Sequence, residues 1–253
     1  MSIKTAVMNG VATIEIARPE KKNAITFAMY QAMAEALRSA QDDGAVRAVL
    51  ITGQPGIFTS GNDLEDFVAR PPGGDSPAFQ FMKALIGIDK PVVAAVTGAA
   101  IGIGTTMLLH CDLVYVSDEA RLAMPFVSLG LVPEFASSLV FPQLAGRAKA
   151  AEKLLLGDPF SAQDAVDLGI ANAVLPAAEV VNHARRIAER FNALPPGAVR
   201  ETKKLMRRAS AELVLQTIGV EGQAFTARLQ TPEAKEAFSA FFQKRKPDFA
   251  QFS

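Results

Sequence analysis

Two periods of apolar positions alternate along the first 175 residues: short β-branched runs typical of strands, and longer stretches with the spacing of one helical face. The chain opens on two such runs, residues 3–8 and 11–16, which flank Asn9-Gly10 and predict a β-hairpin. Thr26 is placed to cap a helix that continues to about Gln41. Further strands are predicted at 46–52, 92–96, 113–116 and 171–175, a turn into a short helix at 57–64, and helices at 79–88, 148–156 and 162–168.

Beyond residue 176 the periodicity is almost wholly helical, with a break at Pro195-Pro196-Gly197. The helices are predicted at 180–191, 199–208, 211–229 and 232–244. Strand, glycine turn and helix follow one another twice before this region, which predicts an α/β fold with parallel, right-handed winding. We therefore expect a core at 1–195 and a helical region at 196–253, whose apolar residues must pack on the core or on another subunit.

The stretch from Pro91 to Ser138 carries the candidate chemistry. A buried strand at 92–96 is followed by Gly98, Gly102 and Gly104 and then by a predicted helix at 105–109. Such a turn presents free backbone N–H groups at a helix N-terminus, where partial positive charge collects. It is suited to an oxygen that becomes negative during a reaction.

Glu134 stands alone among the apolar residues of 131–135, which would desolvate its carboxylate and raise its pKa. An oxyanion site and one base in an apolar setting indicate proton transfer next to a carbonyl. An alternative is open at this point: Pro133 can begin a helix, and Glu134 would then be an ordinary first-turn acid.

Composition narrows the function classes. The chain has 253 residues, 49% of them hydrophobic, and its 26 basic and 26 acidic residues cancel, so we expect neither a nucleic-acid nor a membrane partner. A single cysteine, Cys111, and two histidines give no spaced ligand set for a metal, and His110 reads as a core residue. Charges in the first 25 residues argue against a secretory signal, so a cytoplasmic location is expected.

Several ordered motifs resemble the crotonase, or enoyl-CoA hydratase/isomerase, superfamily: residues 18–25, 58–64, 90–96, 98–104 and 161–171. The resemblance implies a spiral of ββα repeats with a C-terminal helical trimerisation region, assembled as trimers or hexamers. It also implies an acyl-CoA thioester whose carbonyl oxygen is bound by two backbone N–H groups. Carried over by position, these belong to Asn62 and Ile103.

Within the superfamily, the chain departs from the hydratases. Thr106 and Phe126 stand where hydratases resemble one another in carrying two glutamates. Residues 132–135 are instead similar to the single-glutamate Δ3,Δ2-enoyl-CoA isomerases. The resemblance thus implies that Glu134 alone moves a proton from C2 to C4 of a 3-enoyl thioester in β-oxidation, while Phe126, Leu131 and Phe135 exclude water.

The resemblance also implies contacts to substrate and CoA, with no metal and no cofactor, since CoA is part of the substrate. The residues carried over are Lys22, Ala24, Ser60, Gly61, Leu64, Gly102, Phe126, Leu131, Phe242 and Lys246. Residues 70–77, rich in proline and glycine, are a candidate flap over the pocket. Two alternatives stay open: another crotonase activity, such as an enoyl-CoA hydratase or an acyl-CoA lyase, and a non-catalytic acyl-CoA-binding paralogue.

Overall fold

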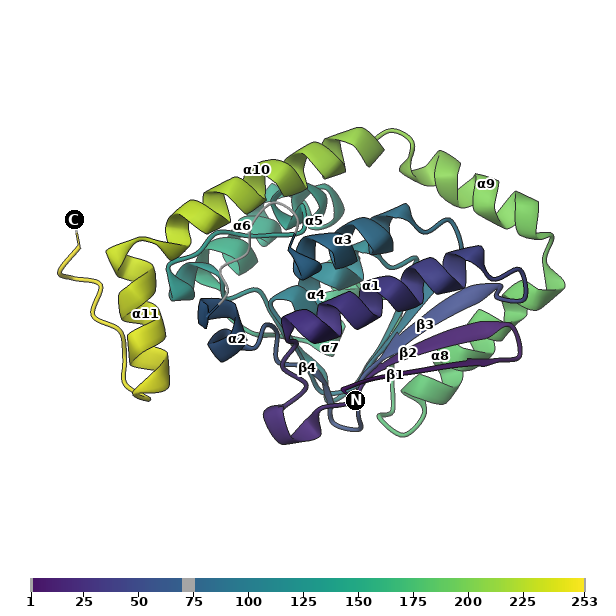
Figure 1. The fold of residues 1–253 in the computed structure, drawn as a ribbon, viewed down its shortest axis with the longest axis horizontal. Coiled ribbons are helices and arrows are strands. Elements are labelled where there is room, and N and C mark those ends of the chain that lie inside the picture. Colours follow the sequence, from purple (N-terminus) through teal and green to yellow (C-terminus); the bar gives the residue numbers. More distant parts are fainter. Residues whose placement is uncertain (1, 70–75, 253) are drawn as a thin grey trace.

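The protein, described by a computed structural model over residues 2–69 and 76–252, is built around a six-stranded sheet (Figure 1). The strands lie in the order β1-β2-β3-β5-β7-β10, and every neighbouring pair except β1 and β2 is parallel. Their bounds are Ile3–Met8 (β1), Val11–Ile16 (β2), Ala48–Thr52 (β3), Val92–Val96 (β5), Leu113–Ser117 (β7) and Ala173–Leu175 (β10).

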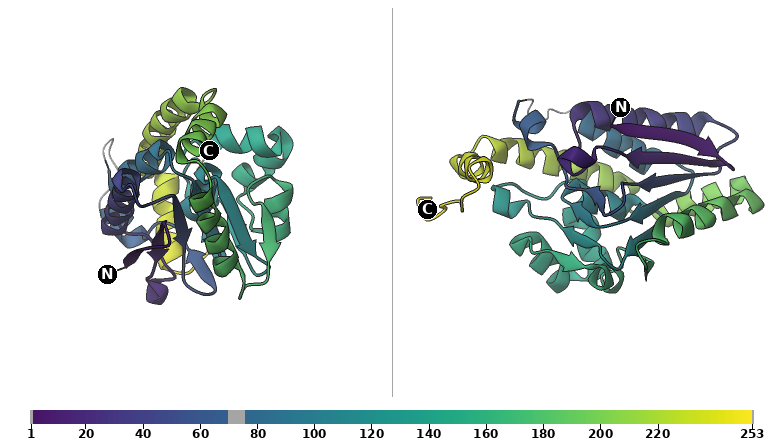
Figure 2. Two further views of the ribbon diagram at one scale, coloured as in Figure 1. Left: turned by 90° about the vertical axis from the view of Figure 1, so that its right-hand side faces the viewer. Right: turned by 90° about the horizontal axis from the view of Figure 1, so that it is seen from below.

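Both faces of this sheet are covered, which explains the continuous apolar run of β5. Val92 and Ala94 pack in a large cluster with α1 (Phe27–Asp42) and α3 (Pro77–Gly87), whereas Val93 and Ala95 pack against α8 (Val180–Glu189). Figure 2 shows α1 and α8 on opposite sides of the sheet.

The hairpin and the first helix form as the sequence predicts. Asn9 and Gly10 both have positive φ, as the tight turn between β1 and β2 requires. Thr26 caps α1 by accepting a hydrogen bond from the backbone N–H of Met29. The predicted caps of later helices are also present: Ser161 and Asp164 form a capping box at α7 (Ala162–Asp167).

Two glycine-rich segments, at 57–64 and 98–104, contain short strands, so their prediction as turns alone is wrong. They contribute to a second sheet with the order β4-β6-β8-β9, at Ile57–Thr59 (β4), Ala99–Ile101 (β6), Arg121–Ala123 (β8) and Phe160–Ser161 (β9). These strands are too short to give a period of their own. Gly98 is required because a Cβ there would lie 1.8 Å from the Gly56 carbonyl oxygen.

The two sheets together give the expected spiral of ββα repeats. Each of β3, β5 and β7 in the large sheet is followed by β4, β6 or β8 in the small sheet, and then by a helix. The helices that follow are α2 (Leu64–Ala69), α4 (Ile103–Thr106) and, after a longer connection, α5 (Ser137–Ala145).

Three helix predictions need correction. The helix expected at 105–109 is α4 followed by a 3₁₀ turn at Met107–His110. Helix α5 is not predicted, because Pro142 interrupts its pattern, although it directly precedes α6 (Arg147–Leu156). The proline pair at 195–196 begins α9 (Pro196–Arg207), since proline is well suited to the first turn of a helix.

The last three helices, α9, α10 (Ala211–Leu229) and α11 (Pro232–Phe242), form an arm over one side of the molecule (Figure 1). As expected, part of its apolar surface packs on the core, through Ile218, Phe225 and Phe238. Other apolar side chains of the arm are exposed: Leu205, Met206, Leu213, Leu215, Val220, Phe241 and Phe242. None of the helices in the described ranges is long and apolar enough to span a membrane.

Candidate active site

The carboxyl ends of β4 and β6 lie side by side, because the two strands pair in parallel. Asn62 follows β4, and Ile103 follows β6 as the first residue of α4. The two turns approach closely at Gly61, which has a φ of 94° and where a Cβ would lie 2.9 Å from the Ile101 carbonyl oxygen. A side chain at position 61 would separate them.

The backbone N–H groups of Asn62 and Ile103 have no acceptor among the described residues. The first N–H of a helix has no partner inside that helix, while the preceding N–H, that of Gly102, binds the Ala123 carbonyl at 2.9 Å. On the other turn, the N–H groups on either side of Asn62 are bound, by the Thr59 hydroxyl and by the Ile25 carbonyl. Both groups therefore lie at adjacent strand ends; Asn62 lines the cavity described below and Ile103 does not, and their role as oxyanion donors stays a prediction.

Glu134 lies in an irregular segment that precedes α5, so the alternative of a helix first-turn acid is wrong. Its side chain is buried, and its carboxylate accepts a 2.5 Å hydrogen bond from the Thr106 hydroxyl of α4. Burial raises the pKa of Glu134 to about 8, against the opposing effect of the Thr106 hydrogen bond, and the nearby charge of Glu221 raises it further. The carboxyl group therefore takes up and releases its proton close to neutral pH, as acid–base chemistry requires.

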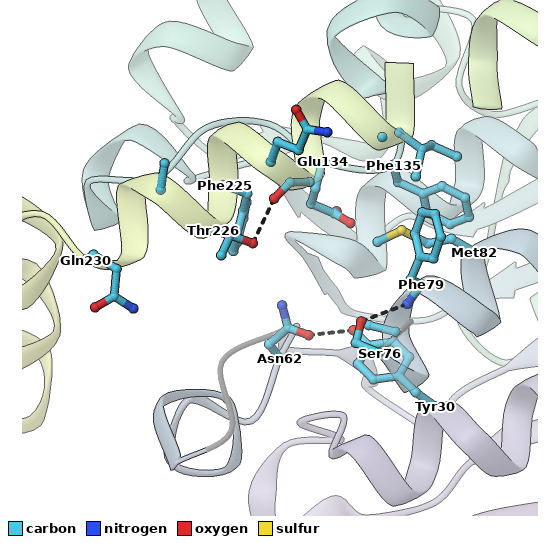
Figure 3. A pocket seen from close by; sticks show the side chains of 16 residues that line it. Tyr30, Asn62, Ser76, Phe79, Met82, Glu134, Phe135, Phe225, Thr226 and Gln230 are labelled. Atoms are coloured by element: carbon cyan, nitrogen blue, oxygen red, sulfur yellow. Dashed lines mark hydrogen bonds between the residues drawn. The ribbon is translucent and has the colours of Figure 1, made fainter. Parts of the chain in front are cut away.

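Glu134 and Asn62 face one cavity of about 670 Å³ from opposite walls (Figure 3). Glu134 is the sole carboxylic acid among the described residues that line it. The lining residues are Tyr30, Asn62, Ser76, Ala78, Phe79, Met82, Glu134, Phe135, Ile218, Gly219, Gly222, Gln223, Phe225, Thr226, Ala227 and Gln230. A largely apolar cavity of this size with a few polar groups is typical of a small-molecule site.

Tyr30 is a site residue that the sequence does not reveal. Its hydroxyl donates a 2.5 Å hydrogen bond to the side-chain oxygen of Asn62, and its ring packs against Phe81. Burial, and then the charge of Glu134, raise the pKa of the Tyr30 phenol well above its usual value. In the sequence Tyr30 is only one more apolar position of α1.

Helix α10 forms a whole wall of the cavity, which the sequence also does not reveal. Gly219 and Gly222 line this wall, and a Cβ added at either glycine would meet no atom within 4 Å. The helical spacing of 219, 222 and 226 gives them one face, but only the fold shows that this face meets the cavity.

Of the three apolar residues expected around Glu134, only Phe135 lines the cavity. Phe126 and Leu131 are buried in the core cluster, where the Phe126 ring packs edge-on against Phe225. Gly102 caps α4 with a φ of 57° and also lies outside the cavity lining.

The residues expected near CoA fall into two groups. Lys22 and Ala24 lie beside the end of β4, where the Ser60 N–H binds the Lys22 carbonyl at 3.1 Å. Leu64 follows as the first residue of α2. Phe242 ends α11 and Lys246 follows it, and both are exposed outside the cavity lining of this chain. These assignments stay predictions.

The segment expected to act as a flap, residues 70–77, lies outside the described residues up to position 75. Its remaining part begins α3, where the Ser76 hydroxyl accepts a hydrogen bond from the Phe79 N–H. Ser76 also lines the cavity.

The spiral of ββα repeats is the crotonase fold. The chain belongs to the enoyl-CoA hydratase/isomerase family, whose model matches residues 6–252. It is an enzyme family, and its members carry out related reactions on CoA thioesters, as the following comparisons illustrate.

The chain is 37% identical over 245 residues to enoyl-CoA delta isomerase 2 of Rattus norvegicus, which covers 94% of this chain but only 62% of that longer relative. It is 29% identical to a probable enoyl-CoA hydratase of Bacillus subtilis, with 98% of both chains covered. Among solved structures, that of Pseudomonas aeruginosa OdaA superposes with a TM-score of 0.93 at 54% identity, covering 95% of this chain and 98% of OdaA.

Proposed function

We propose that the protein is a Δ3,Δ2-enoyl-CoA isomerase of fatty acid β-oxidation, which moves the double bond of a 3-enoyl-CoA to the 2-trans position. The observation that carries this proposal is the carboxylate of Glu134, buried in an apolar cavity, facing Asn62 and without a second acid among the described lining residues. The delta isomerase relatives support the assignment.

In the proposed reaction, Glu134 takes a proton from C2 of the substrate. The electron pair moves into a dienolate, whose charge collects on the thioester oxygen between the N–H groups of Asn62 and Ile103. Each such donor is typically worth about 3 kcal/mol of transition-state stabilisation. Glu134 then returns the proton to C4, which leaves the double bond between C2 and C3.

The reaction rearranges atoms without net oxidation or reduction, and water is neither added nor lost. It therefore calls for no redox cofactor, and the enolate charge is met by backbone N–H groups rather than by a metal. CoA enters as part of the substrate.

Hydration of a double bond is the competing activity, because a hydratase is also among the relatives. It needs acid and base functions that act together on a water molecule. Thr106 instead commits its hydroxyl to the Glu134 carboxylate, and Phe126 is buried in the core. No second carboxylate among the described residues faces the cavity to manage the water.

The exposed apolar side chains of the arm support self-association, as a trimer or a hexamer, and we propose that this assembly covers them. A cytoplasmic enzyme with no nucleic-acid partner agrees with the balanced charge of the chain.

The test mixes the purified protein with a 3-enoyl-CoA, and separately with a 2-trans-enoyl-CoA, while conjugated-thioester absorbance and product mass are followed. We expect absorbance to grow with no change in mass, and the 2-enoyl substrate to stay unhydrated. Glu134→Gln should abolish turnover and keep affinity for the CoA ester. Addition of water would establish a hydratase instead, and binding without turnover of either substrate would favour an acyl-CoA-binding paralogue or a crotonase activity on another substrate.

A further inference from the structure

The two residues that follow Glu134 adopt a backbone conformation that side chains disfavour. Phe135 has a φ of 60° and Ala136 a φ of 54°, both in the left-handed region. Neither is a glycine, and a bulky residue such as phenylalanine is uncommon there. Strained pairs of this kind persist only where surrounding contacts hold them.

The peptide unit between Phe135 and Ala136 is held at both of its polar ends. Its carbonyl oxygen lies 2.6 Å from Nε2 of His110, and its N–H donates to a carboxylate oxygen of Glu221 at 2.5 Å. Burial lowers the pKa of His110 to about 4, so the ring is neutral near pH 7. Because a carbonyl can only accept, the neutral ring must carry its proton on Nε2 and donate it.

Glu221 reaches this peptide unit from α10, 85 positions along the chain from Ala136. Its other carboxylate oxygen accepts from the N–H and the hydroxyl of Ser138, at 2.9 Å and 2.5 Å. Glu221 is thus an interior acid that receives three hydrogen bonds from the segment after Glu134. A buried carboxylate with this set of donors fixes the backbone it binds.

His110 holds the other polar end of the same peptide unit. It lies in the 3₁₀ turn that follows α4, and its ring stacks on Phe135 with the ring centroids 4.2 Å apart. Rotation of the peptide unit by half a turn would relax Ala136 to negative φ, and it would break both the His110 and the Glu221 hydrogen bonds. Loss of these bonds would loosen the segment directly after Glu134, in which the Ser137 hydroxyl donates a 2.7 Å hydrogen bond to the Glu134 carbonyl.

We propose that Glu221 and His110 are positioning residues that clamp the Phe135–Ala136 peptide unit and thereby hold the Glu134 carboxylate toward the reacting carbons. Neither residue touches the substrate or exchanges a proton with it. This inference rests on the proposed isomerase function for its kinetic consequence, but its structural part does not depend on which reaction the site performs.

The experiment compares Glu221→Gln with Asp164→Asn as a matched control. Asp164 also accepts hydrogen bonds from backbone and serine donors, the N–H and hydroxyl of Ser161, but it is exposed and lies on α7, outside the cavity lining. Both variants lose a carboxylate that accepts a backbone N–H, so both should melt at a lower temperature. We expect only Glu221→Gln to lower kcat, by about ten- to a hundredfold with KM nearly unchanged, because it misplaces the base. The comparison uses kcat from the high-pH plateau, since loss of the Glu221 charge also lowers the pKa of Glu134.

A second variant approaches the clamp from its other side. His110→Phe keeps the stacked ring and removes the donor to the Phe135 carbonyl. It should also lower kcat at nearly constant KM. Because both residues bind the same peptide unit, the fold loss of kcat in the double variant should be smaller than the product of the two single-variant losses. If the loss of kcat in the double variant equals the product of the two single-variant losses, the shared clamp is contradicted.

Amide hydrogen exchange gives a readout that is independent of the reaction. In Glu221→Gln the Ala136 and Ser138 amides should exchange roughly tenfold faster or more, while strand β5 keeps its protection. If the unmodified protein has no isomerase activity, the proposed function fails and the exchange result still decides the clamp. Unchanged exchange at Ala136, or an unchanged kcat in an active and folded Glu221→Gln variant, would overturn the clamp.

Discussion

The hydroxyl of Thr106 lies 2.5 Å from a carboxylate oxygen of Glu134. The position that would carry a hydratase glutamate therefore carries a hydrogen-bond donor to the single base. This donor favours the ionised form of Glu134, while burial favours the protonated form, and burial prevails. The reactivity of the base is set by the balance between the two.

This balance predicts a pH dependence of catalysis. Glu134 acts as a base only when it has lost its proton, so kcat/KM should rise with pH through about 8. Thr106→Val removes the donor and should move this rise upward by about one to two pH units, since a hydrogen bond to a charged group is worth about 1.5–3 kcal/mol. Thr106→Ser keeps the hydroxyl and should keep the profile. An identical profile for valine and serine would show that the hydrogen bond does not tune the base.

The same buried acid should make folding stability depend on pH. The folded state binds the Glu134 proton more tightly than the unfolded state, so stability is lost as pH rises from about 4.5 to about 8. The slope is about 1.4 kcal/mol per pH unit while only the folded state holds the proton. Glu134→Gln carries no titrating group at this position, so it removes this pH-dependent loss of folding stability. Its melting temperature should exceed that of the unmodified protein by more at pH 8 than at pH 5, and an equal difference at both would refute the assignment.

Tyr30 should support catalysis through Asn62. Tyr30→Phe removes the hydroxyl that binds the Asn62 side chain and leaves the ring against Phe81. A neutral hydrogen bond of about 1 kcal/mol corresponds to a loss of about fivefold in kcat if the whole effect reaches the oxyanion site. Steady-state kinetics with a 3-enoyl-CoA measure the change. A variant that loses thermal stability but no turnover would place Tyr30 in the core alone.

Gly222 should set the length of acyl chain that the cavity admits. Space is open beside its Cα, on the wall that α10 gives to the cavity. Gly222→Leu should reduce kcat/KM for long 3-enoyl chains by more than for short ones. Val220→Leu, which places a leucine on the exposed side of the same helix, is the control. A uniform loss over all chain lengths would mean that the leucine disturbs α10 rather than the cavity.

Local signals allowed much of the large sheet to be predicted. The Asn9-Gly10 turn and the apolar run of β5 can each be predicted from the local sequence alone. The strands β4 and β6 escape prediction because three residues next to glycines show no period, and they form only when the neighbouring ββ units align.

The site residues likewise divide into those that the local sequence reveals and those that only the fold reveals. Glu134 stands out in the sequence because an acid among apolar residues is unusual, and its position in the cavity agrees with that interpretation. Tyr30, Gly222 and Glu221 give no such signal, since each is an ordinary member of a helical pattern. Their roles arise from contacts between elements far apart in the chain, which periodicity does not encode.

Helix α10 carries one further consequence, for the design of shortened or fused forms of the protein. All the motifs that identify the family lie before residue 175, whereas the wall at Gly219 and Gly222 and the clamp at Glu221 lie after residue 210. A fragment that stops at residue 195 would be classified correctly from its sequence and would keep Glu134, yet its cavity would be open to solvent and its base unsupported. A functional truncation must therefore extend through α10.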